Sequence, residues 1–451
     1  MSAGDTVVAT ATPFGESALA VLRISGSLCE TIVGEALGVP YPTPRHAHLS
    51  IYTDLLGNTL DEIIFLYFTK GKSYTGEVSI EISSHGNPLI TKKILDDLVA
   101  RGCRLAEPGE FTRRAFLSGR IDMTQAESVA ALIRAKSDRA LIAAQRLLRG
   151  ALGEKIVQIQ SDLVGLRARL EAYVDFPEED LPTENKSQSI EIFNRIIVNI
   201  KYLRRSASYG RILNSGIKCL IVGRANAGKS TLFNWFCGED RAIVSDTPGT
   251  TRDYLTCRTE IAAFEVEIID TAGIRKGQSS IEKIGMEKTL SLAENADFFI
   301  YVLDSALPYH PHEHAALFKF LNSQNSVLLQ NKSDLPDSTE NPDFLSDCQR
   351  ILTSLQSQKG FDEFLELFSK ILNSSTPPCN DDNVVINSRH DACLQVSENS
   401  LEEARSRLQQ GSIELSLHDI CRALDSLGEI VGITDNETML DKLFQNFCIG
   451  K

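Results

Sequence analysis

The first part of the chain alternates apolar and polar residues in a way that predicts β-strands. The stretches SALAVLRISG and EVSIEISSHG both show the alternation, with Val78, Ile80 and Ile82 on one face of the second. PLITKKILDDLVARG follows with helical spacing and a stop at Gly102, and the Pro- and Gly-rich GVPYPTPRH predicts a loop. We therefore expect a mixed α and β domain over residues 1–118.

Helical periodicity dominates the next part of the chain and returns at its end. One apolar stripe recurs at steps of four and three residues: Leu152, Ile156, Ile159, Leu163, Leu166 and Leu170. Similar spacing returns much later: Leu401, Ala404 and Leu408, then Leu424, Leu427 and Val431. Neither segment, 119–212 or 374–451, has a clear end of its own. We therefore expect the two segments to pack together as one helical domain, with residues 213–373 inserted between them.

Composition narrows the class of protein. The 451 residues are 42% hydrophobic and 24% charged, which is typical of globular proteins with several domains. No stretch approaches ~18 uninterrupted apolar residues, and the start lacks a secretory pattern, so we expect neither a membrane span nor secretion. The ten cysteines contain no C-x-x-C pair, which favours reduced thiols in the cytoplasm. The net charge of −14 disfavours general binding to nucleic acid but leaves a local basic patch open.

A phosphate-binding loop opens the inserted segment. The apolar strand IKCLIVG is followed by GRANAGKST, which fits G-x-x-x-x-G-K-[ST], and then by the helical TLFNWF. In such loops backbone N–H groups surround phosphate oxygens, while Lys229 adds positive charge and Ser230 offers a hydroxyl to Mg²⁺. The strand–loop–helix order therefore predicts a nucleotide site.

Three further motifs follow in the order that a GTPase requires. GTTRD places Thr250 and Thr251 where a switch loop reaches the metal and the γ-phosphate, and EVEIIDTAG places Asp270 where it can hold Mg²⁺ through water. SVLLQNKSD is a strand that ends in an Asn-Lys-Ser-Asp motif, whose Asp334 carboxylate complements the N1–H and amine of guanine and repels adenine. The segment SLQSQKG occupies the place of a guanine loop, although Leu355 fits the usual pattern poorly.

One residue that a Ras-type enzyme would need is missing. Such enzymes follow the Asp-Thr-Ala-Gly turn with a glutamine that orients the attacking water, whereas this chain has Ile274. Either the chain hydrolyses GTP slowly, or another group positions the water and neutralises charge.

Two other patterns have weaker interpretations. His310, His312 and His314 alternate in a stretch predicted as a surface loop, so zinc binding is less favoured than a solvent-exposed loop. The last four residues resemble the outline of a prenylation box, but its glycine and final Lys451 do not suit the motif.

Taken as a whole, the chain resembles the MnmE (TrmE) family of tRNA modification GTPases. The likeness extends from ATPFGESALAVLRISG through PGEFTRRAFLSGRIDMTQAE and VDFPEED, across the GTP motifs, to the terminal FCIGK. It implies an α/β and α+β multidomain fold: an N-terminal folate-binding and dimerisation domain, a discontinuous α-helical domain and an inserted Ras-like P-loop GTPase domain. The motifs and the resemblance together assign these residues to GTP: Asn226, Ala227, Gly228, Lys229, Ser230, Thr231, Ser245, Asp246, Thr247, Pro248, Gly249, Thr250, Thr251, Asp270, Thr271, Ala272, Gly273, Asn331, Lys332, Ser333 and Asp334.

The resemblance also implies an activity and partners. With the FAD-dependent protein MnmG (GidA), family members add an aminomethyl or carboxymethylaminomethyl group to carbon 5 of the wobble uridine of certain tRNAs. The expected assembly is a homodimer that forms a heterotetramer with MnmG in the cytoplasm, without a membrane. The expected cofactors are Mg²⁺, held by Ser230 and Thr251, K⁺, and 5,10-methylene- or 5-formyl-tetrahydrofolate as the one-carbon carrier.

The resemblance offers an answer to the missing glutamine. In the family, paired G domains bind K⁺ beside the phosphates, and the matching positions here are Asn226, Ser245, Thr247 and Thr250. A carboxylate matching Glu282 would orient the water through a bridging water, although Glu282 also suits a solvated helix start.

Folate contacts carry over to one acidic and three basic residues: Arg23, Glu81, Arg120 and Lys451. Lysine is the familiar residue at the position of Arg120, so the positive charge is kept with different geometry. Cys448 lies near the folate pocket in the family and is expected to act as nucleophile or acid, the alternative being a buried structural thiol.

Two other functions stay open at this point. One is a GTP-dependent switch that acts on ribosomal RNA, and the other is a one-carbon transferase that modifies a protein or small molecule with GTP as regulator. The first leaves residues 1–118 and the cysteine tail without a role.

Overall fold

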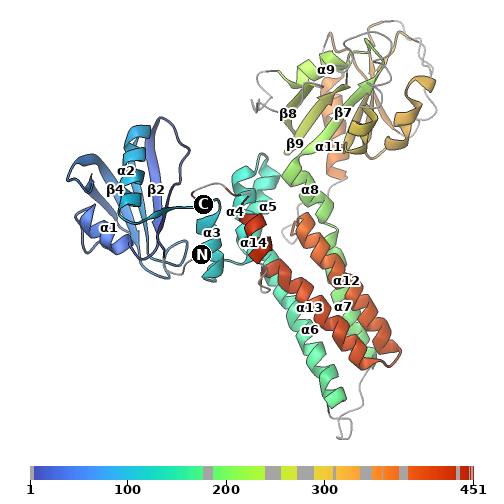
Figure 1. Cartoon of the computed structure of the whole chain (residues 1–451). Helices are drawn as coiled ribbons and strands as arrows, with labels where there is room; N and C mark the ends of the chain where they lie inside the picture. Colours follow the sequence, from blue (N-terminus) through green and yellow to red (C-terminus); the bar gives the residue numbers. More distant parts are fainter. Residues whose placement is uncertain are drawn as a thin grey trace. The chain divides into compact units, whose positions relative to one another are not determined.

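The computed structural model describes most of the chain in two compact units. The described residues are 5–175, 186–238, 255–271, 289–307, 311–335, 348–357, 359–374, 384–432, 437–445, 447 and 450. The first unit comprises Met1–Ile133, Arg146–Ile197 and Cys393–Lys451, and the second comprises Arg134–Gln145 and Val198–Ala392. Figure 1 shows the helices and strands of both.

A six-stranded sheet forms the first part of the first unit, in the order β3-β4-β5-β2-β1-β6. Its strands are β1 (Val7–Thr10), β2 (Ser17–Ser25), β3 (Ala47–Thr53), β4 (Thr59–Phe68), β5 (Ser79–Gly86) and β6 (Arg104–Leu105). Only the β1–β6 pair is parallel. The two alternating stretches predicted as strands are thus confirmed as β2 and β5, which pair with each other.

Two helices cover one face of this sheet. The helix α1 (Cys29–Glu35) and the helix α2 (Pro88–Ala100) share one buried cluster with the inward residues of β2 and β5, such as Leu22 and Ile80. The Asn87 side chain caps α2 by accepting a hydrogen bond from Leu89 N–H. The opposite face carries Arg23 and Glu81, which alternation places away from that core.

Eight of the described helices lie outside the two sheets and are 8 to 25 residues long. They are α3 (Glu110–Leu117), α4 (Met123–Arg134), α5 (Asp138–Leu148), α6 (Ala151–Asp175), α7 (Lys186–Arg204), α12 (Ser388–Gln409), α13 (Ile413–Val431) and α14 (Glu437–Phe444). The predicted stripe of α6 is buried along its whole length, and α6 packs along α13 (Figure 1). The two separated helical segments therefore share one core. Leu424 is only half-buried, because the buried face of α13 is centred on Ile420, Ala423 and Leu427.

A second six-stranded sheet lies in the second unit, in the order β12-β11-β10-β7-β9-β8. Its strands are β7 (Ile217–Gly223), β8 (Leu255–Ile261), β9 (Phe264–Asp270), β10 (Phe298–Asp304), β11 (Ser326–Asn331) and β12 (Gln349–Leu352). All neighbours are parallel except β8 and β9. The carboxyl ends of β7, β9 and β11 therefore meet at one edge of the sheet, where open α/β sheets bind ligands.

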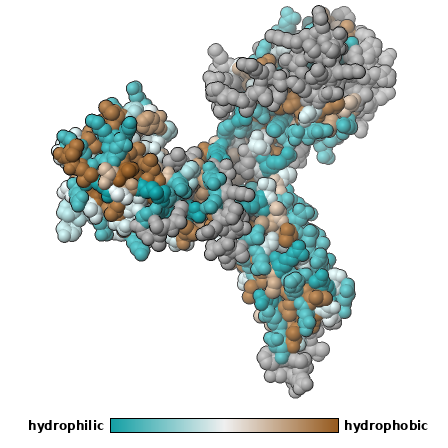
Figure 2. Space-filling model, viewed as in Figure 1, coloured by the Kyte–Doolittle hydropathy of each residue, from teal (hydrophilic) through white to brown (hydrophobic). Residues whose placement is uncertain are grey.

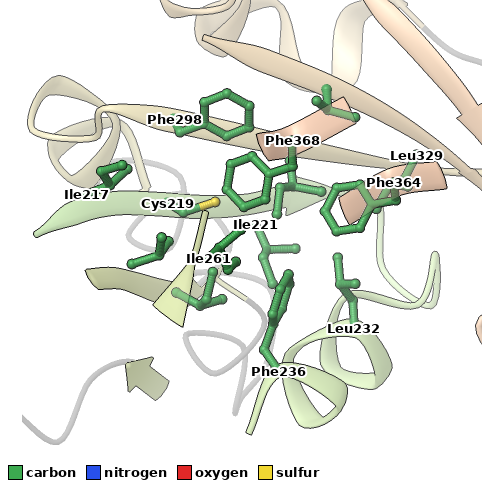
Figure 3. Close-up of a cluster of buried hydrophobic side chains, with 14 of the residues drawn as sticks. Ile217, Cys219, Ile221, Leu232, Phe236, Ile261, Phe298, Leu329, Phe364 and Phe368 are labelled. Atoms are coloured by element: carbon green, nitrogen blue, oxygen red, sulfur yellow. The ribbon is translucent and has the colours of Figure 1, made fainter. Parts of the chain in front are cut away.

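An aromatic core holds helices against this sheet. Figure 3 shows Phe364 and Phe368 of α11 (Phe361–Ser374) beside Ile221 of β7 and Phe236 of α9 (Lys229–Phe236). The helix α8 (Ala207–Ser215) precedes β7 and ends at Gly216. The predicted boundary at 212/213 falls inside α8, and the domain boundaries remain predictions.

Two further findings concern predicted features. The residues after β10 form a 3₁₀ helix, Pro311–Phe320, where the proline-rich sequence predicts a surface loop. His310 and the side chains of the other two histidines lie outside the described residues, so the zinc hypothesis stays untested. Among the described helices, none has the length and apolarity needed to cross a membrane.

Candidate functional site

The phosphate loop joins β7 to α9 and depends on glycine at two points of close contact. Gly223 has φ +143°, and a Cβ there would lie 2.2 Å from the carbonyl oxygen of Val302. Gly228 has φ +111°, and a Cβ would lie 2.3 Å from Nδ2 of Asn331. Between them Asn226 has φ +63° and an exposed side chain. The loop therefore reaches its shape because side chains are missing where other elements approach it.

Lys229 lies inside this loop. Its Nζ donates hydrogen bonds to the carbonyl oxygens of Gly223, at 2.9 Å, and Arg224, at 2.6 Å. The residue is only 5% exposed. These bonds hold the ammonium group at the first turn of α9, where N–H groups and the helix dipole favour phosphate. Phosphate oxygens that entered the loop would take over the donors that now bind backbone carbonyls.

Two oxygen groups suited to a metal meet where α9 begins and β9 ends. Ser230 Oγ donates to Oδ2 of Asp270 at 3.1 Å, and Asp270 is fully buried at the end of β9. The next residue, Thr271, donates from its hydroxyl to the carbonyl oxygen of Ile221 at 2.9 Å. A hydroxyl next to a carboxylate is the hard oxygen set that Mg²⁺ prefers, so these residues fit the predicted metal.

Asn331 connects the phosphate loop to the predicted guanine loop. Its Nδ2 donates to the carbonyl oxygen of Ala227 at 2.8 Å, and its Oδ1 accepts from the N–H of Leu355 at 3.0 Å. Because one side chain fixes both loops, phosphate and base sites are held at a set separation. The poorly fitting SLQSQKG segment thus meets Asn331 through its backbone, which any side chain at position 355 permits.

The rest of the Asn-Lys-Ser-Asp motif lies beside that contact. Lys332 has φ +63°, and its Nζ lies 2.5 Å from Oδ2 of Asp304 at the end of β10. Ser333 donates from its N–H to the carbonyl oxygen of Thr353 at 3.1 Å. The Ser354 hydroxyl lowers the pKa of Asp334, which is exposed. Asp334 is therefore an ionised acceptor at neutral pH, as guanine recognition needs.

Much of the predicted switch region is not described. The residues outside the described part are Ser245, Asp246, Thr247, Pro248, Gly249, Thr250, Thr251, Ala272, Gly273, Ile274 and Glu282. The assignments of these residues to K⁺, Mg²⁺, GTP and catalysis therefore remain predictions.

On the first sheet, Arg23 and Glu81 form a partly shielded ion pair. They lie opposite each other on β2 and β5, and Arg23 donates to Oε1 of Glu81 from Nε at 2.9 Å and from Nη2 at 2.8 Å. Their side chains are 18% and 28% exposed. Among the described residues, only Oε1 of Glu81 is engaged, so Oε2 can accept further donors.

The end of the chain reaches this ion pair. Nη1 of Arg23 donates to the carbonyl oxygen of Gly450 at 3.3 Å. Before it, the Cβ of Phe447 lies 2.9 Å from where a Cβ on Gly109 would stand. Lys451 and Cys448 lie outside the described residues, so their predicted roles remain predictions.

Arg120 lies on the other side of a loop that borders Arg23. Its Nη1 donates to the carbonyl oxygen of Gly71 at 3.3 Å, and its Cγ would lie 3.3 Å from a Cβ on Gly76. Sequence reasoning placed Arg23 and Arg120 in one site but missed the loop 69–78 between them. The sequence around Gly76 contains no pattern that would have identified this loop as part of the site.

An ionic network around the buried residues Glu110 and Arg114 supports this region and was also missed. Arg114 donates to Oδ1 of Asp5 at 2.6 Å, to Oε2 of Glu77 at 2.9 Å and to Oε1 of Glu110 at 3.0 Å. Arg104 joins Asp5 and Glu110 at 2.8 and 2.7 Å. These five residues fix α3 against β6 and the loop before β5. Charged residues so far apart in sequence give no joint signal until the fold brings them together.

Comparisons with known proteins cover nearly the whole chain. A family model described as "MnmE helical domain" matches residues 123–448, and one described as "GTP-binding protein TrmE N-terminus" matches residues 6–120. The "tRNA modification GTPase MnmE" of Opitutus terrae is 40% identical over 449 residues, 99% of each chain. The protein of the same description from Aquifex aeolicus is 37% identical over 450 residues, 99% of this chain and 100% of that one. A solved G domain, of the T. maritima FeoB iron transporter, covers 35% of this chain at 21% identity with a TM-score of 0.27.

Proposed function

Because the chain belongs to the MnmE (TrmE) family of tRNA modification GTPases, we propose that it uses potassium-activated GTP hydrolysis to modify wobble uridines. Family membership makes it a GTP hydrolase involved in tRNA modification. The proposed product carries an aminomethyl or carboxymethylaminomethyl group on carbon 5 of the wobble uridine of certain tRNAs. The observation that carries the proposal is that one chain holds a P-loop nucleotide site and, on a separate sheet, the Arg23–Glu81 pair.

GTP is proposed to bind along the carboxyl edge of the second sheet. Lys229 exchanges its two backbone acceptors for phosphate oxygens, and the first N–H groups of α9 donate to the same phosphates. Ser230 and Thr251 are the proposed ligands of Mg²⁺, with Asp270 behind Ser230. Asp334 accepts the two donors of guanine, while Asn331 holds the base and phosphate loops together.

The proposed answer to the missing glutamine involves a monovalent cation. K⁺, when bound, supplies positive charge beside the phosphates, the role that an arginine finger has in other GTPases. The proposed ligands are Asn226, Ser245, Thr247 and Thr250. Asn226 fits this role because it is an exposed residue of the phosphate loop whose side chain carries an amide oxygen. Glu282 is proposed to orient the attacking water through a second water, so Ile274 needs no polar group.

A folate is proposed to bind at the Arg23–Glu81 pair. Oε2 of Glu81, which accepts no hydrogen bond from the described part of the chain, suits the N–H edge of a pteridine, and the cations Arg120 and Lys451 suit its glutamyl carboxylates. The bound 5,10-methylene- or 5-formyl-tetrahydrofolate supplies the one-carbon unit. Cys448 is proposed to act as nucleophile or acid during transfer, so Cys448→Ser should abolish wobble modification. Normal modification in that variant would show that Cys448 has only a packing role.

The proposed partners are a second copy of the chain, MnmG and tRNA, in the cytoplasm. Support for the homodimer comes from the face of the first sheet opposite α1 and α2, where β2, β3 and β4 expose large apolar residues: Leu19, Leu49, Ile51 and Ile64. Leu49 and Ile64 are direct neighbours on β3 and β4. Figure 2 shows hydrophobic residues exposed on this domain. Such patches on globular proteins mark interaction sites.

The two alternatives are less well supported. A pure switch on ribosomal RNA gives no role to a preformed Arg–Glu pair, and neither alternative accounts for membership in a tRNA modification family. Folate binding by the chain would further disfavour the pure switch.

The test is mass analysis of tRNA wobble uridines in a deletion strain. The strain would carry the wild-type chain, Lys229→Ala, Glu81→Gln or the control Glu414→Gln, an exposed glutamate of α13. We expect modified uridines with the wild type and the control. We expect none with Lys229→Ala or Glu81→Gln, and none without the flavoprotein partner. Unmodified uridines in the wild-type strain, or full modification with Lys229→Ala, would contradict the proposal.

A further inference from the structure

We infer that Tyr74 is the aromatic wall against which the pteridine ring of the folate stacks, an inference that rests on the proposed folate site. Tyr74 lies in the loop 69–78 between β4 and β5, and its ring centroid is 5.6 Å from Cζ of Arg23. Cζ of Arg23 also lies 5.7 Å from the ring centroid of Phe111, but Phe111 is fully buried. Tyr74 is 37% exposed, so of these two rings it alone is open to a ligand.

The position of the ring is fixed at both ends. Its hydroxyl is 3.0 Å from Oγ1 of Thr112, a fully buried residue of α3. Its neighbours in sequence, Ser73 and Thr75, are 3% and 1% exposed, so the backbone on either side is anchored in the interior. Burial raises the pKa of Tyr74, which keeps the phenol neutral. A ring held in this way loses little conformational entropy when a ligand stacks on it.

A network of hydroxyl groups anchors the loop beneath the ring. Oγ of Ser25 is 2.7 Å from Oγ1 of Thr75 and also donates to Oε2 of Glu77 at 2.7 Å. Oγ of Ser118 donates to the carbonyl oxygen of Thr75 at 2.7 Å. The same Glu77 carboxylate accepts from Arg114 of the ionic network around Glu110. The loop is therefore supported from two elements, β2 and α3 with its C-cap residue Ser118, and an aromatic side chain on it has a defined place.

Tyr74 also lies on the loop that contacts two of the three predicted cations. Its ring contacts Arg23, while Gly76, two positions on, packs against Arg120. Glu81 shares Arg23 with Tyr74 and keeps Oε2 open for donors. Consider a ligand whose flat end carries N–H donors and whose other end is anionic. If the donors bind Glu81 and the anionic end reaches Arg120, the ligand passes the ring of Tyr74. A reduced pteridine joined to p-aminobenzoylglutamate has that chemistry, and flat heterocycles bind aromatic side chains by stacking.

The test compares ligands with and without the pteridine ring. The purified full chain and its variants would be titrated with 5-formyl-tetrahydrofolate and with p-aminobenzoylglutamate, which lacks the pteridine. Because stacking of a heterocycle is worth about tenfold or more in affinity, Tyr74→Leu should bind 5-formyl-tetrahydrofolate about tenfold more weakly. It should bind p-aminobenzoylglutamate as the wild type does. The difference absorbance spectrum of the bound pteridine should also lose its stacking band.

Two controls separate stacking from general damage. Tyr74→Phe keeps the ring and should keep the difference spectrum, and Tyr41→Leu removes a tyrosine that is 93% exposed elsewhere. Wild-type binding of 5-formyl-tetrahydrofolate by Tyr74→Leu overturns the inference. Equal weakening for both ligands also overturns it, because Tyr74 would then only support Arg23. A wild-type chain that binds no folate instead overturns the proposed site itself, and this inference with it.

Discussion

Arg23 donates a hydrogen bond from Nη1 to the carbonyl oxygen of Gly450, 3.3 Å away, although 427 positions separate the two residues. Gly450 has φ +90°, and a Cβ there would lie 2.2 Å from the carbonyl oxygen of Thr10. The end of the chain therefore reaches the Arg23–Glu81 pair only because glycine permits the close approach to β1.

We predict that Gly450→Ala displaces this end and weakens folate binding. Loss of one hydrogen bond to a charged group should reduce affinity for 5-formyl-tetrahydrofolate about tenfold, measured by calorimetry. Gly411→Ala is the matched control, since Gly411 also has a positive φ, +86°, but its Cβ would meet nothing within 4 Å. Equal affinities for the two variants would show that the tail does not contribute to the site.

Glu110 should be a large contributor to the stability of the first unit. Its side chain is fully buried and accepts from Arg104 and Arg114 at 2.7 and 3.0 Å. Because Glu110→Ala leaves two arginines with a lost partner, we expect a loss of about 3 kcal/mol in the free energy of unfolding, measured in urea. The exposed neighbour Glu107 is the control, and Glu107→Ala should change the free energy of unfolding by less than about 0.5 kcal/mol.

The same residue predicts a dependence on pH. Burial alone would raise the pKa of Glu110, but bonds from Arg104, the N–H of Glu107 and Arg114 lower it below its ordinary value of 4.5. A depressed pKa in the folded state gives stability that is present above the unfolded value and lost as the pH falls through the folded one. Urea midpoints of the wild type should therefore drop below pH 4.5 more than those of Glu110→Ala. Parallel curves for the two proteins would assign acid sensitivity to other groups.

Asp334→Asn should change the choice of base. The carboxylate is proposed to accept two donors of guanine, so its loss should weaken GTP binding about a hundredfold. Asparagine offers a donor and an acceptor, which suits xanthine, and xanthosine triphosphate should bind the variant better than GTP does. Fluorescent nucleotide analogues would measure both affinities. Unchanged GTP affinity would place the guanine contact elsewhere.

GTP turnover should depend on the monovalent cation. We expect turnover in K⁺ to exceed that in Na⁺ by at least about tenfold. In other GTPases, a positive charge at the position of the arginine finger accelerates hydrolysis by more than this factor. Asn226→Ala should remove most of the difference between the salts while GTP still binds. Phosphate release, with dimerisation checked by light scattering, gives the comparison. Equal rates in both salts with the dimer intact would leave Ile274 unexplained.

Glu282→Ala should slow hydrolysis with little change in nucleotide affinity. A group that orients the attacking water acts in the transition state, so kcat should fall about a hundredfold. Glu287→Ala, a nearby glutamate of the same segment, is the control. Loss of GTP binding in the first variant would make Glu282 structural.

The sequence by itself determined the elements and the nucleotide motifs. Alternation predicted β2 and β5, the four-and-three spacing predicted α6, and the buried strand before GRANAGKST predicted β7 and α9. These features are local, because side-chain periodicity and glycine conformation are set within a few residues. Family resemblance added Arg23 and Glu81, which β2 and β5 place opposite each other.

Only the tertiary structure decided which distant residues meet. Three contacts join Tyr74 to Arg23, Gly450 to Arg23 and Asn331 to Ala227, across 51, 427 and 104 positions, and no local pattern encodes these partners. The buried charges of Glu110 and Arg114 look like ordinary surface residues in the sequence. They are stable inside only because the fold gives each an oppositely charged partner at hydrogen-bond distance.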